Sequence, residues 1–395
     1  MHAAGSHGKE ENRMTQIDEL NLDPEKQESA KRYARIRRRI YVLDIALGGL
    51  YLLWWLVSGT SILLEGSISE LNVGWAAELI LIAFLIFLPW TILFLPLDFY
   101  SGYILPHRFG LSTQDIRGWL TDLLKSFGVS ILLGAPLLVG LYALIRVFPE
   151  TWWLWAVIGY TLIGTVLTIL APVLLLPLFY KLEPLGEAYQ ELVERLLMLA
   201  DRAKATAQGV YTIDMSRRTH AANAALVGMG KTRRILLGDT LIESFTTDEI
   251  ESVLAHELGH HVHRDIPLSI LIQSGLNLIV FFVGAKTLEW IAASLGIPFV
   301  YNPALLPALV LVFSIVGFLT MPIGNAFSRW RETMADDFAL DMTQNPSAFV
   351  NAMTRLANQN LAEASPERWI VFLLHSHPPL ENRIERAKRF TAQSN

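Results

Sequence analysis

Apolar runs of 18 or more residues recur along this 395-residue chain and constrain its fold more than any other feature. Runs of this length are typical of helices that cross a lipid bilayer. Trp and Tyr gather at several of their ends, as interfacial aromatic residues do. We therefore predict a multi-span, all-α membrane protein. The stretches long enough to span are 40–64, 75–99, 127–148, 152–176, 266–285 (able to continue to 295) and 304–327.

Composition agrees with a membrane protein and excludes other classes. The chain is 52% hydrophobic and 17% charged, whereas soluble domains are about 45–50% apolar and about 25% charged. Its net charge of −5 gives no basis for nucleic-acid binding. The absence of cysteine excludes disulfides, a thiol nucleophile and cysteine-ligated metals. Carboxylates, histidines, hydroxyls and lysines remain for chemistry.

The chain divides into five segments. Residues 1–30 are polar, lack the apolar core of a signal peptide and are expected to form a disordered tail, with Met14 as a second candidate start. Four spans occupy 31–179 and two more occupy 266–327. The polar region 180–265 is expected to be catalytic, and 328–395 to form a helical C-terminal region.

Positive charge predicts the orientation of the spans. Six Lys and Arg residues crowd segment 31–39, whereas the alternate loops 65–74, 149–151 and 296–303 contain none. By the positive-inside rule, both polar regions face the cytoplasm. The membrane is then the bacterial inner membrane, or the endoplasmic reticulum in a eukaryote.

The strongest chemical signal is the sequence His256-Glu257-Leu258-Gly259-His260. Residues i and i+4 share one face of a helix, so both imidazoles can reach one zinc ion. Zinc lowers the pKa of a bound water to about 7. Glu257 is placed to take a proton from that water. The alternative is a chance match on a solvated helix.

Catalytic zinc usually has three protein ligands. His263 shares the helix face, but one straight helix cannot easily converge three side chains on a tetrahedral ion. Glu332 is the better third ligand, with Asp336 one turn further on as a hydrogen-bond partner of a ligand imidazole. The alternative is that these carboxylates are surface charges paired with Arg329 and Arg331.

Local patterns around the motif predict a small β structure and one kink. Segments 210–214 and 233–237 are β-prone, and Gly228 and Gly230 between them indicate a hairpin. Thr247 and the acidic residues after it are expected to cap a helix that extends to about Arg264. Pro267 predicts a kink where that helix enters the fifth span.

Taken together, HELGH and the later Glu332-x-x-Ala335-Asp336 resemble the type I CAAX prenyl proteases, which are integral-membrane zinc metallopeptidases. Further segments carry the resemblance from about residue 30 onward. They are 177–179, 182–185, Asn223-Ala224, 235–240 and His377-Pro378-Pro379 followed by Arg383.

The resemblance implies one zinc ion per chain and a zincin-like catalytic region with an edge strand. Asn223 and Ala224 would lie on that strand and bind an extended peptide. His377 and Arg383 would face the active site, with His377 stabilising an oxyanion. The implied partners are the lipid bilayer and a protein C-terminus, prenylated or not. No role is assigned to His220, His261, His375, Asp44 or Asp98.

Two departures from the family leave the substrate open. The family's Asn-Ala-Tyr is Asn223-Ala224-Ala225 here, and six spans are counted where well-known eukaryotic members have seven. A quality-control protease of membrane proteins is therefore the first alternative. A transporter or channel and an inactive zinc-binding scaffold are further ones, although neither explains Glu257.

Overall fold

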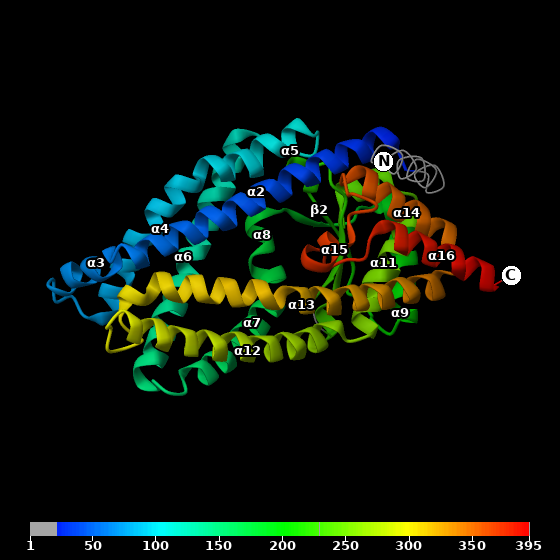
Figure 1. Ribbon diagram of the computed structural model, residues 1–395. Helices are drawn as coiled ribbons and strands as arrows, with labels where there is room; N and C mark the ends of the chain where they lie inside the picture. Colours follow the sequence, from blue (N-terminus) through cyan, green and yellow to red (C-terminus); the bar gives the residue numbers. More distant parts are fainter. Residues whose placement is uncertain (1–21, 229, 395) are drawn as a thin grey trace, which may run out of the picture.

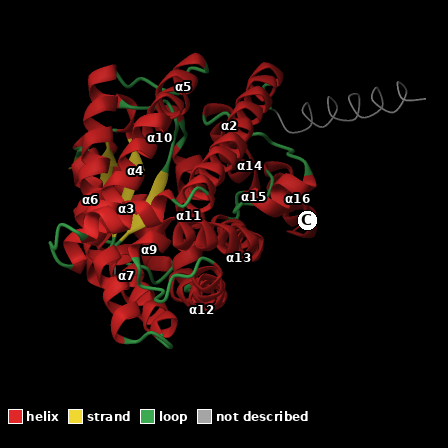
Figure 2. Cartoon of the chain, turned by 60° about the vertical axis from the view of Figure 1, so that its left-hand side comes forward, coloured by secondary structure: helices red, strands yellow, loops and turns green. Residues whose placement is uncertain are grey.

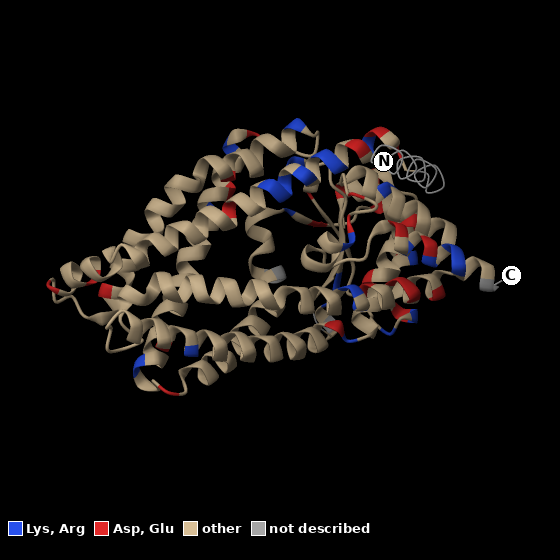
Figure 3. Ribbon diagram, viewed as in Figure 1, with Lys and Arg blue, Asp and Glu red and all other residues tan. Residues whose placement is uncertain are grey.

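The computed structural model describes residues 22–228 and 230–394. Within them, six helices are long and apolar enough to cross a membrane. Long helices form one end of the molecule, and a smaller mixed region forms the other (Figure 1). Charged residues concentrate in that smaller region and along the first part of α2 (Pro24–Val57), whereas the end formed by the long helices carries few of them (Figure 3). The long helices are α2 (Pro24–Val57), α4 (Trp75–Phe99), α6 (Ile116–Val147), α7 (Trp152–Leu174), α12 (Asp265–Ser294) and α13 (Leu306–Thr343).

The first helix starts earlier than the sequence analysis places it. Residues 24–30, assigned there to a disordered tail, form the first turns of α2, while residues 1–21 lie outside the described part. The Asp23 carboxylate accepts hydrogen bonds from the N–H groups of Glu25 and Lys26, and Pro24 follows the cap. Gln27 is buried and hydrogen bonds to Ala362 O and Ala364 N. The C-terminal region therefore orders this segment.

The first apolar run is broken rather than continuous. Gly59 adopts φ 71°, which favours glycine, and it separates α2 from α3 (Thr60–Ser69). Helix α4 continues through a π-helical turn, Tyr100–Ile104, into α5 (Leu105–Arg108). A short helix, α8 (Leu176–Phe179), follows α7. The spans predicted at 75–99 and 152–176 correspond closely to α4 and α7.

A four-stranded sheet with strand order β1-β2-β4-β3 lies among helices of the smaller region (Figure 2). Strands β2 and β4 are parallel, and the other pairs are antiparallel. The hairpin predicted at Gly228 joins β3 to β4. A Cβ on Gly228 would stand 2.5 Å from Thr232 O, so only glycine fits there. The strands are β1 (Leu182–Pro184), β2 (Val210–Ile213), β3 (Ala224–Val227) and β4 (Arg234–Gly238).

Helices enclose the sheet and complete the core of the catalytic region. The helix with the HELGH sequence, α11, contacts α9, β3, α12, α13 and α14. Leu196, Ile235, Leu254 and Phe349 are buried at the centre of this core. The surrounding helices are α9 (Gln190–Arg202), α10 (Asp239–Ser244), α11 (Thr247–Val262), α14 (Pro346–Gln359), α15 (Arg368–Leu374) and α16 (Leu380–Ser394).

Helix α11 ends differently from the prediction. Its C-cap is His263, and Arg264 adopts the left-handed conformation with φ 55° before α12 begins at Asp265. Pro267 lies in the first turn of α12, where a missing N–H costs no hydrogen bond. The chain therefore turns two to three residues before the proline.

Candidate metal centre

Helix α11 presents the two histidines on one face. Thr246, one residue earlier than expected, caps the helix through a reciprocal pair of hydrogen bonds with Glu249. His256 and His260 follow one turn apart, and their Nε2 atoms are 3.2 Å from each other. Leu254, Ala255 and Leu258 are buried in the core. The predicted helix and the shared face of the two imidazoles are both present.

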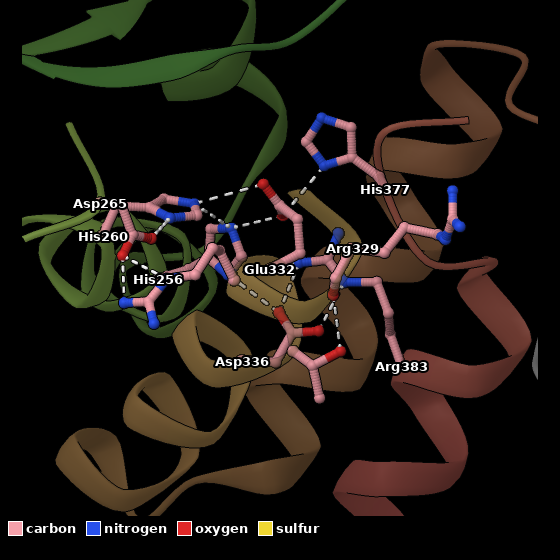
Figure 4. Close-up of polar contacts among 10 residues, drawn as sticks. His256, His260, Asp265, Arg329, Glu332, Asp336, His377 and Arg383 are labelled. Atoms are coloured by element: carbon pink, nitrogen blue, oxygen red, sulfur yellow. Dashed lines mark hydrogen bonds and ion pairs between the residues drawn. The ribbon is translucent and has the colours of Figure 1, made fainter. Parts of the chain in front are cut away.

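Helix α13 brings Glu332 to the same point. Its Oε2 lies 3.2 Å from His256 Nε2, and its Oε1 lies 3.4 Å from His260 Nε2. This close approach depends on Gly259, because a Cβ there would stand 3.0 Å from Ala335 Cα. His256 and Glu332 are 7% and 6% exposed. Side chains of α11 and α13 that are 72 and 76 residues apart in sequence therefore meet at one buried cluster (Figure 4).

The three side chains fit a metal ion. Their ligand atoms all lie within 4.8 Å of one another. Each imidazole bonds a carboxylate through Nδ1, so its Nε2 presents a lone pair to the cluster. Two such lone pairs and a buried carboxylate repel one another unless a cation or a proton lies between them. Imidazole and carboxylate donors are the ligands of catalytic divalent metals.

A chain of charged groups orients His256. Its Nδ1 lies 2.9 Å from Asp336 Oδ1, as the sequence analysis predicts for this aspartate. Arg383 binds both oxygens of Asp336, with Nε donating over 2.8 Å and Nη2 over 2.5 Å. Asp336 is 1% exposed. The guanidinium therefore compensates the buried carboxylate, which in turn fixes the imidazole.

A second chain of the same kind orients His260, and the sequence analysis missed it. His260 Nδ1 lies 2.7 Å from Asp265 Oδ2. Arg331 Nε donates to Asp265 Oδ1 over 2.7 Å, and its Nη2 donates to His263 O over 3.0 Å. Asp265 and Arg331 are both buried. The left-handed residue Arg264 separates α11 from α12, and Asp265 at the start of α12 contacts His260.

The surroundings shift the pKa values of two residues on α11. Burial lowers the pKa of His256, but hydrogen bonds with Asp336 and Glu332 outweigh that effect and raise it to about 9. A metal ion that binds His256 would displace this proton. Burial also raises the pKa of Glu257, against the opposing positive charge of His256 and His260. A raised carboxyl pKa is typical of a general base near neutral pH.

The C-terminal region contributes His377. Its Nδ1 lies 2.9 Å from Glu332 Oε2, and its side chain is 62% exposed. Figure 4 shows His377 on the side of Glu332 away from Asp265. Both residues that the resemblance implies in this region, His377 and Arg383, therefore reach the cluster. They line one cavity of about 800 Å³ together with residues of α2.

Asn223 and Ala224 lie at the start of β3, the edge strand that packs against α11. Asn223 is exposed and its carbonyl accepts a hydrogen bond from Gly238 N. Of the histidines left without a role, His220 and His375 each accept a hydrogen bond through the backbone carbonyl. Burial and then Arg233 lower the pKa of His261.

Long apolar helices are joined to a region that contains an HExxH helix and a carboxylate, Glu332, as the candidate third ligand. This combination defines an integral-membrane metallopeptidase. The chain belongs to peptidase family M48, whose model matches residues 187–391. A model described as "CAAX prenyl protease N-terminal, five membrane helices" matches residues 9–181. The protein is therefore a multi-pass membrane hydrolase with a metal centre.

Relatives span bacteria and eukaryotes. The chain is 29% identical over 380 residues to the "Uncharacterized metalloprotease YhfN" of Bacillus subtilis, covering 95% of this chain and 88% of that protein. It is 34% identical to the CAAX prenyl protease 1 of Saccharomyces cerevisiae, over 49% of this chain and 42% of that one. A CAAX prenyl protease 1 homolog of Oryza sativa is 30% identical, over 73% and 68%.

The fold matches a solved structure. The crystal structure of S. mikatae Ste24p superposes with a TM-score of 0.82 and 22% sequence identity, covering 94% of this chain and 90% of the other. This similarity confirms the predicted fold class: a multi-span helical protein with a small sheet.

Proposed function

We propose that this chain is a zinc-dependent endopeptidase, with one zinc ion held by His256, His260 and Glu332. The convergence of these three side chains supports the proposal most directly. The Nε2 atoms of His256 and His260 are 3.2 Å apart, and the two oxygens of Glu332 lie 3.2 Å from His256 Nε2 and 3.4 Å from His260 Nε2. A tetrahedral zinc ion with ligands at about 2.0–2.1 Å requires an edge of roughly 3.3 Å. These spacings are close to that edge, which supports the fit of the ion.

Zinc bound there would supply a Lewis acid that lowers the pKa of a water to about 7. Glu257, beside both ligand imidazoles, takes a proton from the attacking water and passes it to the leaving amine. Asp336 and Asp265 keep the Nε2 lone pairs of the two imidazoles directed at one point. The buried surroundings strengthen each of these interactions.

His377 is suited to stabilise the transition state. Its exposed ring stands next to Glu332, so an N–H can donate to the carbonyl oxygen on which negative charge develops. Arg383 acts through Asp336, because both of its hydrogen bonds there hold the carboxylate against His256. The two C-terminal residues therefore have different roles.

The edge strand β3 is the proposed binding site for the substrate backbone. Ala224 pairs with Leu237 of β4 on one side, and a peptide in extended conformation can add to the free side as a further strand. Ala224 is the first residue of this strand, and Asn223 directly precedes it. Since β3 packs against α11, a peptide there passes beside the HExxH helix.

We place the active site on the cytoplasmic face, in the bacterial inner membrane or the endoplasmic reticulum. The loops that connect the far ends of the long helices, 148–151 and 296–302, contain no Lys or Arg. Arg32, Arg35 and Arg39 are exposed on the first part of α2, which lies at the same end as the catalytic region (Figure 1). This asymmetry supports the assignment.

The proposed substrate is a protein C-terminus that carries a prenyl group. Relatives from yeast and plants are named CAAX prenyl proteases. A lipid chain costs about 0.8 kcal/mol per CH₂ to keep in water, so a lipidated substrate favours an enzyme within the membrane.

One observation favours a second candidate, the removal of damaged membrane proteins without prenyl specificity. Ala225 stands on β3 where the prenyl proteases carry a tyrosine, so this strand lacks an aromatic ring for substrate contact. The bacterial relative that matches over most of the chain is named only as a metalloprotease. Substrate choice separates the two candidates.

The test uses the purified protein with a farnesylated CAAX peptide and its unmodified twin, and locates cuts by mass spectrometry. Loss of the last three residues from the farnesylated peptide alone would support the prenyl protease. Cuts in both peptides at scattered apolar positions would support the second candidate. A Glu257→Gln variant is the control, and cleavage that persists in it would contradict the mechanism.

A further inference from the structure

Residues 365–381 form a loop that carries His377 and is closed at its base. Ser365 Oγ donates to Glu381 Oε2 over 2.7 Å, and Glu381 N donates to Ala364 O over 3.4 Å. We call this segment, which includes α15, the His377 flap. Ile370 is the only buried side chain of α15, while Trp369 is 58% exposed. Pro366 is the other buried residue of the flap, so few apolar side chains hold the flap in place.

Polar side chains of α13 hold it instead. Arg329 Nη1 donates to Val371 O over 3.0 Å and to His375 O over 2.6 Å. Asn325 Nδ2 donates to Leu373 O over 2.7 Å. Leu373 and His375 lie at and just beyond the C-terminus of α15, where helix carbonyls lack intrahelical partners and attract positive charge. Val371 lies in the last turn, and its carbonyl also accepts from His375 N over 3.3 Å. Two residues of α13 thus provide a cap for α15.

The spacing on α13 links this cap to the metal centre. Asn325, Arg329 and Glu332 occupy positions i, i+4 and i+7, so they share one face of the helix. The same face therefore holds the flap backbone and presents the third ligand candidate. Between these points, His377 Nδ1 lies 2.9 Å from Glu332 Oε2. The labelled residues Arg329, Glu332 and His377 can be followed in Figure 4.

We propose that Arg329, assisted by Asn325, is a positioning residue that fixes the His377 flap, so that His377 faces the reacting carbonyl. The proposal rests on the function proposed above for His377. Arg329 acts through the backbone carbonyls of Val371 and His375. Its loss frees the flap while the two ligand imidazoles keep their own partners, Asp336 and Asp265.

The first test measures the flap itself by hydrogen exchange in the full-length protein. Arg329→Ala should raise amide exchange in residues 371–377 by about tenfold or more, because hydrogen bonds from a charged donor are lost. Arg329→Lys should restore part of the protection. Arg368→Ala, at an exposed arginine of the flap itself, is the matched control and should leave exchange unchanged. Unchanged exchange in Arg329→Ala would overturn the proposal.

The second test measures catalysis and metal content together. Arg329→Ala should lower kcat about tenfold or more, with KM and zinc content near those of the wild type. In a His377→Ala background the same change should cost nothing further, since both act through one group. An additive loss, or a loss of zinc, would show that Arg329 has a general structural role. Should Arg329→Ala fail to fold, Arg329→Lys and Asn325→Ala carry both tests.

The exchange measurement also separates this proposal from the proposed function. If neither peptide is cut in a Glu257-dependent way, the function fails. The exchange data still decide whether Arg329 holds the flap, because they require no substrate.

Discussion

Gly259 of α11 lies so close to Ala335 of α13 that a Cβ on the glycine would stand 3.0 Å from Ala335 Cα and 3.2 Å from its carbonyl oxygen. This contact sets the distance between the helix that carries both histidines and the helix that carries Glu332. Because the neighbouring atoms are backbone, they cannot move aside without moving α13. The glycine is therefore a requirement of the proposed metal centre, although it contributes no ligand.

Replacing Gly259 with valine should weaken metal binding. The added side chain pushes α13 away and withdraws Glu332 from the two imidazoles. We expect zinc affinity, measured by competition with a chromophoric chelator, to fall by at least tenfold, comparable to the roughly 10–100-fold effects of disturbing supporting residues. Gly275→Val is the control, since a Cβ there meets nothing within 4 Å. Equal affinities in both variants would contradict this account of Gly259.

Asp265, which orients His260, should contribute to zinc affinity as much as Asp336, which orients His256. Asp265→Asn and Asp336→Asn each remove the negative charge that selects the imidazole tautomer, and they leave Arg331 and Arg383, respectively, without a charged partner. Zinc affinity should fall roughly 10–100-fold in both. Asp337→Asn is the control and should have little effect on zinc affinity. Asp337 follows Asp336 in sequence, but its half-exposed side chain pairs with Arg386. Wild-type affinity in Asp265→Asn would show that this contact is dispensable.

Metal removal should destabilise the catalytic region. A ligand that binds only the folded state raises Tm, so chelation should lower Tm and added zinc should restore it. Glu257→Gln should retain this shift because Glu257 is not a ligand. Glu332→Gln should lose most of it. A Tm that does not respond to chelation in the wild type would argue against a bound metal.

The absence of cysteine makes the orientation directly testable. Single cysteines at Glu150, in the loop after α6, and at Glu191, on α9, both occupy exposed positions. In intact cells of a bacterial host, a membrane-impermeant maleimide should label the first and not the second. Permeabilised cells provide the control, in which both should react. Labelling of position 191 alone in intact cells would reverse the proposed topology.

Sequence periodicity predicted the parts of the fold and site that depend on local pattern. His256 and His260 share a face because they are four residues apart, and Glu332 follows an apolar run that ends on the same side of the membrane. The parts that were missed depend on tertiary contacts. Residues 24–30 are polar by composition, yet Gln27 bonds to the C-terminal region and orders them.

Asp265 and β1 illustrate the same limit. Asp265 reaches His260 only because Arg264 adopts φ 55°, and nothing in the local sequence requires that turn. Strand β1 has only three residues and ends in Pro184, so its sequence does not indicate a strand. Its pairing with β2 defines it. The contacts of Arg329 with the flap were not predicted, since its partners there are backbone carbonyls, which have no sequence signal.

The zinc content of purified protein tests the central claim most directly. Elemental analysis compares three proteins prepared without chelator: the wild type, Glu257→Gln and Glu332→Gln. The two variants change a proposed base and a proposed ligand on neighbouring helices. We predict one zinc per chain in the wild type and in Glu257→Gln, and a large loss in Glu332→Gln. Full zinc content in Glu332→Gln, or none in the wild type after incubation with zinc, would contradict the proposed centre.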